Sequence, residues 1–176
     1  MQTIRQATDS DIEAIAAIYG FHVLHGTASF ETVPPGRIEM MRRYSMLRDQ
    51  AYPYLVAEAD GAVVGYAYAG PYRARVAYRN TVEDSIYLRA DLIGRGTGTL
   101  LLGALIAACG QRGYRQMIAV VGDSGSVSSI RLHERHGFSQ IGTLRSVGYK
   151  HGRWLDSVLL QRELGRGGSA PPSSDQ

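Results

Sequence analysis

The sequence predicts a single α/β domain in which one mixed sheet carries helices on both faces. Strand signals follow one another between residues 54 and 89, whereas strand and helix signals alternate from there on. The chain of 176 residues, 44% hydrophobic and 20% charged, is long enough to bury a core. We expect the domain to span residues 1–164. Residues 165–176, rich in Gly, Ser and Pro, are expected to form a disordered tail.

The first half of the chain combines helical and hairpin signals. Apolar residues recur at helical spacing after residue 10, and Ser10 and Glu13 suit a capping box. A loop broken by prolines follows, and Asp60-Gly61 favours a hairpin turn between two apolar runs. The expected elements are a strand at 3–8, a helix at 10–25, a loop at 26–36, a helix at 37–50 and a hairpin at 54–70.

The second half alternates strands with helices. An apolar run of helix-forming residues follows three glycines, and a short apolar run bounded by turn residues comes next. Strand signals around a Gly-rich connection close the domain. The expected elements are a strand at 81–89, a glycine loop and helix at 91–113, a strand at 115–122, a helix at 126–137 and strands within 138–164.

Charge and composition narrow the classes of partner. The net charge of +3 permits attraction to anionic ligands, but no basic stripe interleaved with aromatics indicates nucleic-acid binding. No run approaches transmembrane length, and the first residues lack the apolar core of a signal peptide. The single cysteine, Cys109, excludes an internal disulfide, and we expect it to be a buried structural thiol. We therefore expect a cytoplasmic protein without membrane or nucleic-acid partners.

The glycine stretch "DLIGRGTGTLLL" predicts a backbone cradle at a helix N-terminus. No Lys follows the glycines as in a phosphate-binding P-loop, and Thr99 and Leu101 stand where a dinucleotide fingerprint requires glycine. The N–H groups of this loop and the helix dipole are suited to a pyrophosphate, with Arg95 adding charge. A Gly-rich turn without a ligand is the alternative from this stretch alone.

Several motifs together resemble one acetyltransferase family. They are "TASFETVPP", "YLVAEADGAVVGYAYAGPYRARVAYRNTVEDSIYL", "GRGTG", "SIRLHERHGF" and "VGYKHGRWLD". Taken together they resemble the GNAT N-acetyltransferases, in particular the phosphinothricin and methionine sulfoximine or sulfone acetyltransferases. The resemblance covers nearly the whole chain apart from the tail. It implies the GNAT fold, with a mostly antiparallel sheet splayed where acetyl-CoA binds, and a homodimer.

The resemblance also implies which residues hold acetyl-CoA as co-substrate. Two positions depart from the family pattern: Ile93 replaces a Gln or Arg at the start of the loop, and Ser126 replaces an Asn. A backbone N–H near Leu88 is implied as the group that stabilises the developing oxyanion. The expected cofactor-binding residues are Ile86, Tyr87, Leu88, Ile93, Gly94, Arg95, Gly96, Thr97, Gly98, Thr99, Ser126, Ser129 and His133.

Two catalytic residues are expected, Glu83 and His133. A carboxylate can take the proton of an α-ammonium group, and Glu83 matches the family's general base, although a solvated strand-end carboxylate is the alternative. Asp84 should point to the opposite face of the sheet. His133 is expected either to donate a proton to the leaving thiolate or only to line the thiol pocket. His22 and His25 share a helix face, but without a third ligand we expect no metal site.

Substrate recognition is expected from three segments. Arg73, Arg75 and Tyr78 precede the proposed base and suit an anionic head group, although an exposed basic loop is the alternative. Phe30 is expected to supply apolar contact and Glu31 to attract the substrate ammonium. The third segment contains Tyr149, Lys150 and Trp154, which are expected to complete the cavity. If the chain is a dimer, they would come from the neighbouring subunit. Of these we expect Trp154 in the core.

The sequence therefore predicts direct acetylation of the α-amino group of a small amino-acid analogue such as phosphinothricin, methionine sulfoximine or methionine sulfone. Resistance to the herbicide phosphinothricin would follow from that activity. A GNAT enzyme for another amine, a protein N-terminus or an aminoglycoside, is one alternative. A module that binds acetyl-CoA without catalysis is another.

Overall fold

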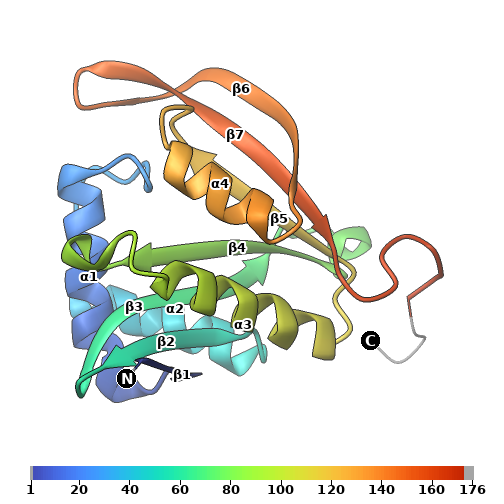
Figure 1. Ribbon diagram of the computed structural model, residues 1–176, viewed down its shortest axis with the longest axis horizontal. Helices are drawn as coiled ribbons and strands as arrows, with labels where there is room; N and C mark the ends of the chain where they lie inside the picture. Colours follow the sequence, from blue (N-terminus) through green and yellow to red (C-terminus); the bar gives the residue numbers. More distant parts are fainter. Residues whose placement is uncertain (1, 173–176) are drawn as a thin grey trace.

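The computed structural model describes residues 2–172, which form one seven-stranded mixed sheet with helices on both faces (Figure 1). The strand order is β1-β2-β3-β4-β5-β7-β6, and every neighbouring pair is antiparallel except β4–β5. The predicted mixed, mostly antiparallel sheet is thus confirmed. The strands are β1 (Gln2–Gln6), β2 (Tyr54–Ala59), β3 (Ala62–Pro71), β4 (Thr81–Leu88), β5 (Gln116–Gly122), β6 (Ser139–Lys150) and β7 (Arg153–Glu163).

Four α-helices cover the two faces of the sheet. They are α1 (Ile12–His25), α2 (Arg37–Asp49), α3 (Thr97–Gln111) and α4 (Val127–Arg135). Short 3₁₀ turns at Asp9–Asp11, Val76–Tyr78 and Ala90–Leu92 precede α1, β4 and the glycine loop. The helices begin and end within a few residues of the predicted positions.

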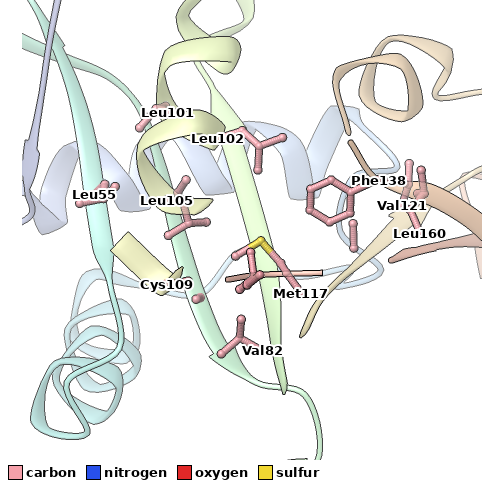
Figure 2. Packing of buried hydrophobic residues seen from close by; sticks show 14 of the residues in the cluster. Leu55, Val82, Leu101, Leu102, Leu105, Cys109, Met117, Val121, Phe138 and Leu160 are labelled. Atoms are coloured by element: carbon pink, nitrogen blue, oxygen red, sulfur yellow. The ribbon is translucent and has the colours of Figure 1, made fainter. Parts of the chain in front are cut away.

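Each face of the sheet has its own apolar core. Figure 2 shows the core beneath α3, where Leu101, Leu102 and Leu105 point onto the strands. Burying one such side chain contributes about 1.5–3 kcal/mol. Cys109 lies in the same core, and burial raises the pKa of its thiol to about 12, as expected of a structural thiol. The second core joins α1 and α2 to stacked tyrosines of β2, β3 and β4.

The start of α1 differs from the prediction. Asp11, not Glu13, completes the capping interaction, because its Oδ2 accepts a hydrogen bond from the Thr8 backbone N–H at 2.8 Å. Ser10 lies inside a 3₁₀ turn and its hydroxyl only hydrogen-bonds with that of Thr8. Arg5 holds both oxygens of Asp11 at 2.7 and 2.8 Å and lowers the pKa of that carboxyl to about 2. A partly buried ion pair with Arg5 therefore favours the cap at Asp11 over one at Glu13.

Strands β4 and β5 separate partway along their length. Their parallel register runs from Thr81 opposite Gln116 to Asp84 opposite Ala119 and ends there. Beyond that point β5 continues alongside β7, and β4 continues alongside β3. The backbone of residues 85–88 therefore has no β5 partner, which leaves a gap in the middle of the sheet.

The segment after β7 turns back towards β5. The Arg115 side chain donates hydrogen bonds to the carbonyl oxygens of Gly167 and Ala170, at 3.0 and 2.7 Å. Residues 173–176 of the expected disordered tail lie outside the described part of the chain, so the disorder of 165–176 stays a prediction, as does the domain boundary at 164.

Candidate active site

A cavity of about 320 Å³ opens where β4 and β5 separate. Its walls come from β4, β5, α4 and the loop between α1 and α2. Seven of the predicted site residues line it: Phe30, Glu83, Ile86, Tyr87, Ser126, Ser129 and His133. The fold thus brings both predicted catalytic residues, Glu83 and His133, to a single cavity, together with some of the predicted cofactor-binding and substrate-binding residues.

Glu83 and Asp84 reach this cavity from opposite faces of β4. The charge of Glu83 acts on Tyr68, which packs against the α1–α2 core, whereas the charge of Asp84 acts on Cys109 in the α3 core. The predicted alternation of these two side chains is therefore present. Desolvation raises the pKa of Glu83, the neighbouring charge of Asp84 raises it further, and Arg73 lowers it. The raised pKa makes Glu83 a stronger base than an ordinary exposed carboxylate.

His133 forms a buried pair with Asp84 that the sequence did not predict. Its Nε2 lies 3.0 Å from Asp84 Oδ2, and its Nδ1 lies 2.8 Å from the carbonyl oxygen of Ser129. The two residues are only 2% and 6% exposed. Burial opposes the charged imidazolium, but the hydrogen bond and the charge of Asp84 outweigh it and raise the pKa of His133. The residues lie 49 positions apart, and no spacing pattern connects them.

The glycine loop has the backbone conformation of a cradle. Gly94 and Gly96 have φ values of +84° and +86°, and Gly96 is the N-cap of α3. A Cβ at either position would meet nothing within 4 Å, so the backbone is open on that side. Successive N–H groups in such a conformation bind anions. The conformation of the loop is compatible with the pyrophosphate that its sequence predicts, and the binding itself stays a prediction.

Other predicted loop residues have structural contacts. Ile93 is exposed, whereas Thr97 is fully buried and its hydroxyl donates to Gln2 Oε1 at 3.2 Å. Gly98 packs closely against α4, because a Cβ there would lie 3.2 Å from Leu132. The carbonyl of Thr99 lies 3.1 Å from Nε2 of His136. The backbone of this loop is therefore better placed for a ligand than the Thr97 side chain.

Ser126, one of the two predicted departures from the family pattern, is the N-cap of α4. Its hydroxyl donates to the carbonyl oxygen of Gly122 at 2.9 Å, and it lines the cavity. Leu88, at the end of β4, lies outside the cavity lining, and its carbonyl oxygen is 2.7 Å from Nε2 of His22. Among residues 2–172 no group of three or more His, Cys, Asp or Glu is arranged to hold a metal ion.

The loop between α1 and α2 forms one wall. Phe30 lines the cavity, but Glu31 is already bound by Arg43 at 2.6 Å and by the Tyr19 hydroxyl at 2.8 Å. Burial opposes ionisation of Glu31, but these hydrogen bonds outweigh it and lower its pKa. A substrate ammonium would therefore compete with Arg43 for this carboxylate. Sequence reasoning missed Arg43, because nothing in the pattern of α2 distinguishes it from the neighbouring arginines.

The predicted basic loop connects β3 to β4. Arg73 lies over the ring of Tyr72, and Tyr72 packs edge-on against Tyr78. Arg75 caps the 3₁₀ turn of residues 76–78 and is exposed. None of these side chains lines the cavity itself, but the charge of Arg73 reaches Glu83. The loop therefore lies on the side of the cavity that Glu83 faces.

The β6–β7 hairpin, orange to red in Figure 1, contributes the third predicted set. Lys150 is buried, and its Nζ donates to the carbonyl oxygen of Ser29 at 2.6 Å. Tyr149 and Trp154 pack edge-on against each other. Trp154 is 63% exposed, so its prediction as a core residue is wrong. An aromatic side chain at an edge hairpin, unlike one in a central strand, has no helix above it to cover it.

The fold and the cavity define a GNAT acetyltransferase. The family model described as an acetyltransferase (GNAT) domain matches residues 4–159, and the chain belongs to this family. The fold class and the family predicted from the sequence are thus confirmed.

Curated relatives of known activity are similar over almost the whole chain. The phosphinothricin N-acetyltransferase of Alcaligenes faecalis is 54% identical over 170 residues, which cover 97% of this chain and 86% of the relative. The L-methionine sulfoximine/L-methionine sulfone acetyltransferase of Pseudomonas aeruginosa is 40% identical, covering 96% and 98%. A phosphinothricin acetyltransferase from Sinorhizobium meliloti, solved in complex with AcCoA, superposes with a TM-score of 0.96 at 45% identity, covering 99% and 94%.

Proposed function

We propose that this chain transfers the acetyl group of acetyl-CoA directly to the α-amino group of a small amino-acid analogue, such as phosphinothricin, methionine sulfoximine or methionine sulfone. The observation that carries the proposal is Glu83, a desolvated carboxyl group lining the cavity where β4 and β5 separate. The names of the similar proteins support this choice of substrates. Acetylation of phosphinothricin would give resistance to that herbicide.

The residues present fit acetyl-CoA on three sides. The Gly94–Thr99 loop would hold the pyrophosphate, the β4 backbone at Ile86–Leu88, which has no β5 partner, would hold the pantetheine arm, and Ser126 and Ser129 would line it. When bound, acetyl-CoA supplies the thioester that is attacked. Leu88, Ile93 and Arg95 remain proposed contacts of the same ligand.

Glu83 would prepare the amine for attack. An α-ammonium group has a pKa of about 8, so most of it is protonated at neutral pH and cannot attack a carbonyl. Glu83 takes this proton, the neutral amine forms the amide bond, and the bond to sulfur breaks, so that CoA leaves as the thiol. His133 lines the same cavity beside the proposed path of the thiol.

The basic loop between β3 and β4 favours an anionic amino acid as substrate. Arg73 and Arg75 present guanidinium groups on the β3–β4 loop, and Tyr78 adds a hydroxyl. Phe30 would contact the apolar part of the substrate. An aminoglycoside, which is polycationic, would be repelled by this loop.

We propose that the enzyme is a cytoplasmic homodimer. Exposed apolar side chains gather on β6 and β7, namely Ile141, Leu144, Val147, Tyr149 and Trp154. Where such exposed apolar side chains form a contiguous patch, they mark a protein interface. Among the described residues no helix is long and apolar enough to cross a membrane.

The test is release of CoA thiol with a panel of amines. The panel holds phosphinothricin, methionine sulfoximine, methionine sulfone, methionine, an aminoglycoside and a short peptide. We expect release with the first three, and a loss of at least 100-fold in kcat for Glu83→Gln. The matched control is Glu134→Gln, which removes an exposed carboxylate on α4 and should leave the rate unchanged. Release only with the peptide or the aminoglycoside would overturn the substrate class, and CoA binding without any release would indicate a binding module.

A further inference from the structure

The hydrogen bonds of His133 fix where its protons are. Nδ1 faces the carbonyl oxygen of Ser129 at 2.8 Å, and a carbonyl only accepts, so Nδ1 must carry a proton. Nε2 faces Asp84 Oδ2 at 3.0 Å, and an ionised carboxylate also only accepts. Either Nε2 also carries a proton, or Asp84 does. The pair thus holds one proton more than a neutral imidazole beside a carboxylate would.

Burial decides the charge balance of this pair. The Asp84 side chain is 1% exposed and that of His133 3%, and Asp84 Oδ1 is buried without a hydrogen-bond partner. An unpaired carboxylate in such a place is strongly disfavoured, so a compensating proton is required. The hydrogen bond and the charge of Asp84 raise the pKa of His133, so that proton resides on Nε2.

Among residues 2–172, no second positively charged group acts on His133 in a way that would replace this proton. The ionisable groups around Asp84 are Glu83 beside it on β4, Cys109 from α3 and His133 from α4. Burial keeps the Cys109 thiol neutral. Two uncharged residues also face the pair. On β5, Ala119 stands opposite Asp84 in the register, and just before β6, Phe138 packs edge-on against the His133 ring. Glu83 carries negative charge, which only adds to the need for a proton on His133.

We propose that Asp84 is a positioning residue for acetyl transfer. Asp84 holds a proton on His133 Nε2 and orients the imidazolium ring against the wall of the cavity between β4 and β5. The pair is then neutral as a unit, and Glu83 carries the net negative charge of the cavity wall. Both ring N–H groups of His133 are used within the protein, so neither points at a leaving thiolate in this arrangement. This inference rests on the proposed function only for its catalytic consequence.

The protonation state is measured directly by ¹⁵N NMR of the histidine side chains in the full chain. The His133 signals are assigned by their absence in His133→Gln. We expect both nitrogens to be protonated in the wild type at pH 7.5. In Asp84→Asn, which keeps the shape of the side chain, Nε2 should lose its proton while Nδ1 keeps its own. An unprotonated Nε2 in the wild type at pH 6.5 would overturn the proposal, even if Asp84→Asn failed to fold.

Kinetics test the consequence for catalysis. Asp84→Asn removes the negative charge beside Glu83, and it also removes the positive charge of the His133 imidazolium, which lies farther from Glu83. Because the nearer charge has the larger effect, Glu83 should become easier to ionise. The acid limb of kcat/KM should therefore shift to lower pH in Asp84→Asn and stay in place in the control Glu134→Gln. A lower kcat with an unchanged limb and unchanged NMR spectra would reduce Asp84 to a packing residue and overturn the proposal. The NMR result does not depend on turnover, so a failure of the proposed function would be recognised separately.

Discussion

The Nζ of Lys150 lies 2.6 Å from the carbonyl oxygen of Ser29, and this contact joins the β6–β7 hairpin to the loop that carries Phe30. The Ser29 hydroxyl hydrogen-bonds with Tyr19, and the Tyr19 hydroxyl donates to Glu31. A connected set of hydrogen bonds therefore fixes the cavity wall formed by the loop between α1 and α2. Burial lowers the pKa of the Lys150 ammonium, while the charge of Glu31 opposes that change.

Removing this contact should weaken substrate binding. Lys150→Met leaves the buried Ser29 carbonyl without its donor, which costs about 1–3 kcal/mol. We expect the KM for the amine to rise about 5-fold or more, while the KM for acetyl-CoA stays within twofold. Steady-state kinetics with each substrate varied in turn measure the difference. Equal rises in both KM values would show that the contact stabilises the whole cavity and not this wall.

Gly148 on β6 should tolerate no side chain while Phe30 stays in place. A Cβ at position 148 would lie 2.6 Å from Cδ2 of the Phe30 ring, and one at Gly122 would lie 2.9 Å from Cε1. We expect Gly148→Ala to lower the free energy of unfolding by about 1–3 kcal/mol, because the ring must move. Chemical denaturation measures this loss.

Two variants separate the clash from other effects of alanine on β6. Gly142 lies on the same strand with nothing within 4 Å of a Cβ, so Gly142→Ala should change stability little. Replacing Phe30 by Ala in the Gly148→Ala background should restore part of the stability lost at position 148. If both glycine variants lose the same free energy, the loss comes from the strand backbone and the ring contact is unimportant.

Arg73 should set the pH at which Glu83 becomes active. Its positive charge lowers the pKa of Glu83, against the raising effects of desolvation and of Asp84. Removing that charge in Arg73→Gln leaves Glu83 protonated up to a higher pH. Because the base works only when ionised, the acid limb of kcat/KM should shift upward. Arg75→Gln, on the same exposed loop, should raise the KM for the substrate without moving the acid limb. If the limb shifts in Arg75→Gln and not in Arg73→Gln, then Arg75 is the residue that adjusts the pKa of Glu83.

Local patterns predicted much of this fold and site, and long-range contacts account for the rest. The alternation of side chains along a strand places Glu83 and Asp84 on opposite faces, and the glycine spacing predicts the cradle before α3. The partner of Asp84 comes from α4, 49 residues away, and that of Glu31 from α2. Neither pairing leaves a trace in local sequence. The cap at Asp11 was missed for a different reason: Arg5 is only six residues away, but its contact forms between a strand and the turn that follows, which no helix-capping pattern describes.

The conformation of Gly96 offers the sharpest test of the acetyl-CoA cradle. Its φ of +86° lies in the left-handed region, where a side chain costs about 1–2 kcal/mol. Gly96→Ala should lower stability by that amount and also tilt the N–H groups that are proposed to bind the phosphates. We expect the KM for acetyl-CoA to rise about 5- to 30-fold, the factor that corresponds to 1–2 kcal/mol.

The matched control is Gly61, whose φ of +77° serves the hairpin turn between β2 and β3. Gly61→Ala should carry a similar stability cost, because the strain is the same and a Cβ there also meets nothing within 4 Å. Its KM for acetyl-CoA should equal that of the wild type, since this turn is no part of the proposed cofactor site. Thermal unfolding and initial rates at varied acetyl-CoA measure the two effects on the same preparations. If Gly96→Ala loses stability with an unchanged KM, the loop is a structural turn and the phosphates bind elsewhere.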